Sequence, residues 1–140
     1  MVMLISWDWI PGEALGPFRF GEEVDTVIRQ YGLRKLDRGG PAEYWDTYEV
    51  PSYHSKVTVE GGKIASVLCE DAICFRKTDL LGLPLPQVRE VLGQEDEFVE
   101  NVGLGDAAYY HRLGLTLWVV NGVVDSATCE LVGASDTRMG

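Results

Sequence analysis

Long apolar stretches are missing from this sequence, which limits where the protein can reside. No run approaches the roughly eighteen consecutive apolar residues that a membrane-spanning helix needs. The apolar start at residues 1–5 is too short for the core of an export signal, follows no basic residue and is interrupted by Asp8. We therefore expect a soluble, cytoplasmic protein without a membrane partner.

Basic residues are scarce as well. The sequence has 12 lysines and arginines against 22 aspartates and glutamates, which gives a formal net charge of -10. Such a field repels nucleic-acid phosphate and speeds association with basic partners. Nucleic acid is therefore disfavoured as a ligand and a basic protein is favoured, although the charge would also be explained by solubility alone.

Cysteine is too sparse to build a disulfide framework. Cys69, Cys74 and Cys129 are an odd number in a chain without an export signal. The spacing Cys69-x4-Cys74 is not followed by a second close ligand pair, as a structural zinc site would require. We expect inert core thiols, no metal and no cofactor. A zinc site or a cysteine nucleophile that uses His54 or His111 is the disfavoured alternative.

The short motifs that mark common catalytic sites are also absent. There is no P-loop, no Gly-x-Ser-x-Gly elbow and no His-Glu-x-x-His. Gly103-x-Gly105-x-x-Ala108 matches the relaxed dinucleotide fingerprint, but a strand instead of a helix is expected to follow it. Carboxylates are abundant, yet no pair is singled out as acid and base. We expect no catalytic residues and no enzymatic activity.

What the sequence does contain is an internal similarity between its two halves. When the sequence is aligned with itself, Gly21 matches Gly82 and Gly32 matches Gly93 at one constant offset. The apolar residues between them recur at i, i+3 and i+7, which is one helical face, and each window ends in a glycine suited to a left-handed C-terminal cap. Each half is therefore predicted to begin with a short helix.

The segments that follow also align, at an offset shorter by a single position, and Cys69-Glu70 then matches Cys129-Glu130. Glycine turns separate β-rich runs in both halves, so each half is predicted to hold a hairpin with one further strand before it. The predicted strands are residues 44–50, 53–60 and 63–70 in the first half, and 107–111, 113–120 and 123–130 in the second.

These patterns predict a single α+β domain over residues 1–140. We expect two tandem helix-strand-strand-strand repeats, at about residues 16–75 and 77–132, after an N-terminal lead-in at residues 1–15. Neither repeat has enough apolar surface to fold alone. The repeats are therefore predicted to share one antiparallel sheet, with both helices packed on one face.

The first repeat opens with a pattern found in known bacterial proteins. Residues 11–21, PGEALGPFRFG, lead through Val24 and Val27 to Gly32. This opening resembles that of tandem-repeat proteins with the architecture of the β-lactamase inhibitory protein and the SmpA/OmlA-like outer-membrane lipoproteins. The resemblance covers about residues 11–132. It implies a fold in which a concave two-repeat sheet binds another protein, and it names no target.

Alternation along the hairpin strands indicates which face could bind. Val57, Val59, Leu117 and Val119 share one parity and are predicted to face the core, so Trp118 points the opposite way. Aromatic residues ringed by carboxylates would suit a basic protein partner, although strand aromatics are also common core residues. The predicted partner-binding residues are Trp118, Tyr48, Tyr53, Tyr109, Asp46 and Glu49.

The leading functional hypothesis is a non-enzymatic bacterial inhibitor or immunity-type protein. It would act as a monomer or weak dimer and occlude a basic partner protein, such as a toxin, with an acidic and aromatic sheet face. The alternative is a small-ligand-binding protein or an enzyme, with its site in the cleft between the repeats near His54, His111 and Tyr109. A third hypothesis is an assembly module that self-associates through an edge strand.

Overall fold

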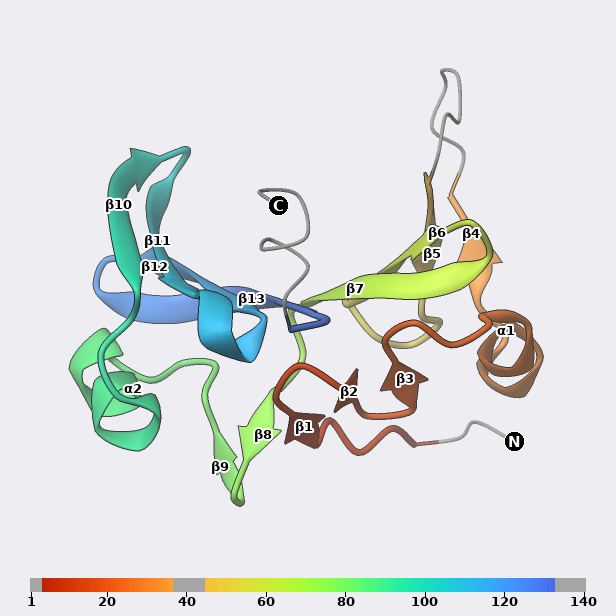
Figure 1. The fold of residues 1–140 in the computed structure, drawn as a ribbon, viewed down its shortest axis with the longest axis horizontal. Helices are drawn as coiled ribbons and strands as arrows, with labels where there is room; N and C mark the ends of the chain where they lie inside the picture. The colour runs from red at the N-terminus through yellow and green to blue at the C-terminus, as the bar shows by residue number, and fades with distance from the viewer. Residues whose placement is uncertain (1–3, 37–44, 133–140) are drawn as a thin grey trace.

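The computed structural model describes residues 4–36 and 45–132 of the chain. Within them, one eight-stranded antiparallel sheet forms the body of the protein (Figure 1). From one edge to the other, its strands are β10 (Glu97–Val102), β11 (Gly105–Tyr110), β12 (Leu115–Val120), β13 (Val123–Glu130), β7 (Lys63–Cys69), β6 (Lys56–Glu60), β5 (Trp45–Glu49) and β4 (Arg34–Lys35). Tyr44, the first residue of one predicted strand, lies outside the described residues.

The remaining elements are short. They are the three-stranded sheet β1 (Trp9–Ile10), β2 (Ala14–Leu15) and β3 (Phe18–Arg19), the pair β8 (Cys74–Phe75) and β9 (Thr78–Asp79), the helices α1 (Asp25–Tyr31) and α2 (Leu85–Leu92), and the 3-10 helix η1 (His111–Leu113). No helix in the described part of the chain is long and apolar enough to cross a membrane.

Both predicted hairpins are confirmed, and they have the same internal geometry. The β6–β7 hairpin is irregular between Thr58 and Val59, where a bulge forms. The β12–β13 hairpin has its bulge between Trp118 and Val119, which are the residues that align with Thr58 and Val59 in the sequence. Position 118 therefore repeats the backbone environment of position 58.

The loop before each helix also makes the same contact with its hairpin. The N–H of Gly21 donates to the carbonyl of Ile64 at 2.7 Å, and the N–H of Gly82 donates to that of Val124 at 2.8 Å. Gly32 ends α1 in the left-handed conformation that the sequence predicted, with φ 68° and ψ 36°. The same prediction is wrong for Gly93, which ends α2 with φ 88° and ψ -173°, outside the left-handed helical region. The two halves thus share the backbone contact between the loop before the helix and the hairpin, and differ in how the helix ends.

The predicted α+β class, with helix-strand-strand-strand repeats and helices packed over one face of the sheet, is wrong. The protein is mostly β, and the two α-helices of the described residues have only 7 and 8 residues. Helices of about two turns bury little, and Val27 is the buried residue of α1. The glycine spacing located both helices correctly, but it carried no information about how much of the sheet they cover.

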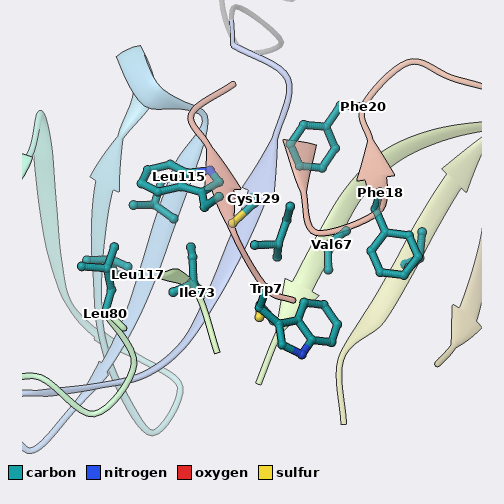
Figure 2. Close-up of a cluster of buried hydrophobic side chains, with 14 of the residues drawn as sticks. Trp7, Phe18, Phe20, Val67, Ile73, Leu80, Leu115, Leu117 and Cys129 are labelled. Carbon is teal, nitrogen blue, oxygen red and sulfur yellow. The ribbon is translucent and has the colours of Figure 1, made fainter. Parts of the chain in front are cut away.

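The N-terminal segment through β3, which is longer than the predicted lead-in and is called the lead-in from here on, covers the middle of the sheet instead. Figure 1 shows β1–β3 beneath the central strands, with α1 and α2 toward the two ends. Trp7, Leu15 and Phe18 are at most 6% exposed and belong to one apolar core with Val67 and Leu117 of the sheet (Figure 2). These large side chains supply the apolar area that the short helices lack.

Candidate partner-binding face

One face of the eight-stranded sheet packs on the core, and no described element covers the other. Val57, Val59, Leu117 and Val119 are at most 3% exposed, which confirms the predicted core parity. Trp118 lies on the opposite side, which we call the open face. One register row on the open face crosses all eight strands. It consists of Glu97, Tyr109, Thr116, Thr128, Leu68, Lys56, Glu49 and Arg34.

The two halves of the open face differ in side chains although their backbones correspond. Trp118 stands where the first half has Thr58, and Tyr109 stands where it has Glu49. At these two positions, the second half has aromatic residues where the first half has a hydroxyl and a carboxylate. Because Thr58 fills the equivalent position, the fold itself does not require an indole at position 118.

The indole of Trp118 is half-buried and makes a hydrogen bond to the neighbouring strand. Its direct partner on β13 is Ser126, but its Nε1–H donates to Oγ1 of Thr128 at 3.1 Å. Thr128 is the diagonal neighbour, so the hydrogen bond holds Nε1 of the indole beside β13. The bond satisfies the only donor of the indole, which leaves the half-buried ring available for a stacking contact.

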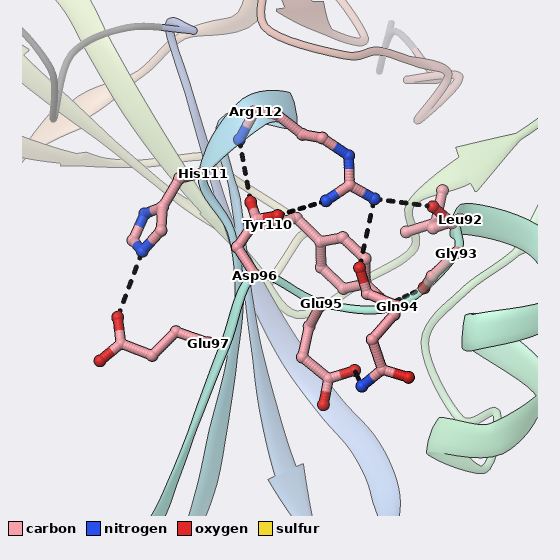
Figure 3. A network of polar contacts seen from close by, with 9 residues as sticks. All are labelled: Leu92, Gly93, Gln94, Glu95, Asp96, Glu97, Tyr110, His111 and Arg112. Atoms are coloured by element: carbon pink, nitrogen blue, oxygen red, sulfur yellow. Dashed lines mark hydrogen bonds and ion pairs between the residues drawn. The ribbon is translucent and has the colours of Figure 1, made fainter.

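Tyr109 forms a second aromatic position on the same half. Its ring stacks on that of His111, with centroids 5.4 Å apart and planes at 12°. Glu97 of the edge strand β10 lies directly opposite Tyr109, and its Oε1 is 3.3 Å from Nε2 of His111 (Figure 3). A carboxylate thus borders the aromatic pair at the sheet edge.

The two predicted acidic residues are already paired within the protein. Glu49 is on the open face, where its Oε1 is 2.6 Å from Nη2 of Arg34. Asp46 lies opposite the buried Val59, on the core side, and its Oδ1 is 3.3 Å from Nζ of Lys35. Both carboxylates are therefore less available to a partner than the sequence indicated.

Tyr48 and Tyr53 lie on the core side as well. Tyr48 is opposite Val57 and packs against the core. The hydroxyl of Tyr53 accepts a hydrogen bond from the N–H of Ile5 at 2.8 Å, and its ring meets Trp7 edge-on at 5.3 Å. These tyrosines hold the core and the lead-in together. Of the six predicted residues, Trp118 and Tyr109 lie on neighbouring strands of the open face, and Glu49 lies farther along the row of Tyr109.

Sequence reasoning predicted no strand at Glu97 and gave no role to Thr128, and both residues join this face through cross-strand pairing. Glu97 stands in an acidic run for which no strand was predicted, and Thr128 is notable only once its bond to Trp118 is seen. The adjacent Phe98 and Val99, both residue types common in strands, could have suggested strand β10. No local pattern could have paired Thr128 with the indole of a different strand.

A polar network holds β10 in place next to this face. Nε and Nη2 of Arg89 donate to the two carboxylate oxygens of Glu95 at 2.8 and 2.6 Å. The side chain of Glu95 is 3% exposed, and the hydrogen bonds from Arg89 lower its pKa despite the opposing effect of burial. This pair fixes α2 to the chain just before Glu97.

The same network anchors the turn that carries His111. The hydroxyl of Tyr110 donates to the carbonyl of Gly93 at 2.8 Å, and Arg112 donates to Asp96 and to the carbonyls of Leu92 and Gln94 (Figure 3). Burial raises the pKa of Tyr110 to about 12. Glu97 and His111 thus each follow directly after a residue that this network holds in place.

The side chains considered for catalysis do not gather at one site. His54 and His111 are both exposed, and the described residues hold no group of three or more side chains that could bind a metal ion. A cavity of about 550 Å³ lies beside α1 and β3 and contains neither histidine; its lining includes Arg19, Glu22 and Lys63. Burial raises the pKa of the Cys69 and Cys129 thiols, which disfavours their reactive thiolate form.

A scan against protein-family models found no match, and searches of curated proteins and of solved structures found none either. Function therefore has to be inferred from the residues of the chain itself.

Proposed function

We propose that this protein is a non-enzymatic protein-binding module, a cytoplasmic bacterial inhibitor or immunity-type protein that occludes a basic partner with its open face. The observation that carries the proposal is the pair Thr58 and Trp118, which occupy the same place in two hairpins with the same bulge. Thr58 serves the fold there without an aromatic ring. A half-buried tryptophan that the fold does not require suits an interface anchor.

The distribution of charge supports a basic partner. On the open face of strands β10 to β13, the charged residues are Glu97 and Glu130. None of the described residues at these strand positions is a lysine or an arginine. The formal net charge of -10 adds a long-range attraction for cations. A partner that docks over Trp118 would therefore be expected to present positive charge.

A toxin that acts on nucleic acid is a concrete version of this partner. Its active site must attract phosphate and is therefore basic, so an acidic sheet that covers it would block substrate access. The resemblance to tandem-repeat inhibitors, drawn from residues 11–132, predicts the same mode of binding and stays a prediction.

Affinity capture at low salt, followed by reconstitution with the purified partner, tests the proposal. Captured proteins would be identified by mass spectrometry, and the affinity of the purified pair would be measured by calorimetry at two salt concentrations. We expect a basic protein whose affinity falls with salt, and a loss of more than about tenfold in Trp118→Thr.

The matched control is Thr58→Ala, which alters the equivalent position of the first half. We expect that variant to keep the affinity of the unmodified protein within about twofold, as is usual for an interface position that is not an anchor. An acidic partner, or equal affinities for the unmodified protein and Trp118→Thr, would refute the proposal.

A further inference from the structure

The indole of Trp118 and its acceptor occur together in one half of the chain only. The position equivalent to Thr128 in the first half is Leu68, directly across the β7–β13 pair, and the position equivalent to Trp118 is Thr58. Leucine cannot accept a hydrogen bond from an indole. The second half therefore combines an indole with a side chain that accepts its hydrogen bond.

The half-buried indole of Trp118 leaves part of its aromatic surface open to a partner on the open face. The negative face of an aromatic ring attracts cations, and a planar guanidinium stacks on it better than an ammonium, because guanidinium is more weakly hydrated. Two carboxylates belong to the same half of the open face: Glu97 on β10 and Glu130 at the end of β13. The aromatic ring and the two carboxylates thus both favour a positively charged group.

We propose that Trp118 receives an arginine side chain of the partner on its ring face, and that Thr128 is the positioning residue that orients the ring. The proposal rests on the proposed function, since it names the chemistry by which the open face would recognise a basic protein. It also predicts that the second half of the sheet, and not the first, binds this group.

Binding of an oligo-arginine peptide, compared with an oligo-lysine peptide of equal length, tests the inference at about physiological ionic strength. Both peptides carry the same charge, so their shared electrostatic attraction cancels in the ratio of affinities. We expect the arginine peptide to bind roughly threefold tighter or more. The ratio should fall to about one in Trp118→Thr, where charge attraction alone remains.

The role of Thr128 is tested by two substitutions of similar size. Thr128→Val removes the acceptor and is expected to reduce the arginine preference, whereas Thr128→Ser keeps an acceptor and should preserve it. The indole N–H resonance of Trp118, assigned by its disappearance in Trp118→Thr, should shift on addition of the arginine peptide. A merely structural role of Thr128 would leave the preference unchanged in Thr128→Val.

The first half allows the reverse experiment. The double variant Thr58→Trp with Leu68→Thr copies the indole and its acceptor onto the equivalent backbone, and we expect it to raise the binding stoichiometry or affinity for the arginine peptide. Equal affinities for the two peptides in the unmodified protein would overturn the inference. If the two peptides bound equally but Trp118→Thr abolished binding of the native partner, the arginine assignment would fail and the proposed function would stand.

Discussion

Leu68 of β7 lies directly opposite Thr128 of β13, and these two residues hold equivalent positions in the two halves of the chain. The neighbouring pairs follow the same relation: Cys69 is opposite Ala127, and Val67 is opposite Cys129. The two halves are therefore joined around a local two-fold relation. Each half consequently supplies a natural control for substitutions in the other.

This relation predicts a small structural cost for Trp118→Thr. Thr58 shows that threonine fits the backbone, so we expect the free energy of unfolding to fall by about 1 kcal/mol, close to the value of the lost hydrogen bond to Thr128. Leu117→Ala, on the fully buried neighbour, should cost about 2–5 kcal/mol. Urea unfolding of both variants checks this, and equal losses would show that the indole is a core residue.

We expect the lead-in to contribute more than the helices to the free energy of unfolding, because it covers the sheet. Trp7 is 6% exposed and contacts Phe18 and Tyr53, so we expect Trp7→Ala to cost about 3–5 kcal/mol. Arg29→Gly, at an exposed position within α1, should cost only about 1 kcal/mol. Chemical denaturation measures both, and a larger cost for the helix variant would contradict this account of the core.

Stability in acid should depend on Glu95. Its pKa is lowered from 4.5 in the folded state by the hydrogen bonds from Arg89, so its stabilising effect is present above that value. The effect is lost as the pH falls through the lowered pKa. We expect Glu95→Gln to be less stable at neutral pH and to have a shallower acid dependence. Thermal melts from neutral to acidic pH measure this dependence, and the exposed Glu90→Gln serves as the control. If the melting temperature of Glu95→Gln fell with pH as steeply as that of the unmodified protein, the prediction would be wrong.

Stability in alkali should depend on Tyr110. Its pKa is raised from 10.0 to about 12 by burial, so the unfolded chain releases this proton first as the pH rises. Stability is therefore expected to fall between these two values. Tyr110→Phe should lose about 1 kcal/mol at neutral pH, because the bond to the Gly93 carbonyl is gone, and should lose less in alkali. Urea unfolding across this pH range measures the difference.

Glycine at position 105 should be required by close packing. A Cβ built there would collide with the backbone oxygen of Val119 on β12, so β11 and β12 would have to separate. At Gly122 a Cβ meets nothing within 4 Å, although its φ of +77° disfavours other residues. We expect Gly105→Ala to lower the melting temperature more than Gly122→Ala. The opposite order would show that backbone conformation, not space, decides both positions.

Part of the candidate site could be predicted from local patterns. The alternation of Val57, Val59, Leu117 and Val119 placed Trp118 on the open face correctly, because strand side chains alternate strictly between faces. The same alternation did not reveal that Tyr48 faces the core, because the parity of β5 depends on which residue of β6 it pairs with. The pairing of Tyr48 with Val57 decides this.

The sequence by itself determined the features that repeat at short range: two hairpins, two short helices, the parity of the hairpin strands and the match between the two halves. Only the tertiary structure decided that the lead-in covers the sheet, that Glu97 lies opposite Tyr109 and that Thr128 holds the indole of Trp118. Local periodicity reports backbone conformation and burial, whereas these contacts join residues on different strands and depend on register. Register is established only when the strands pair.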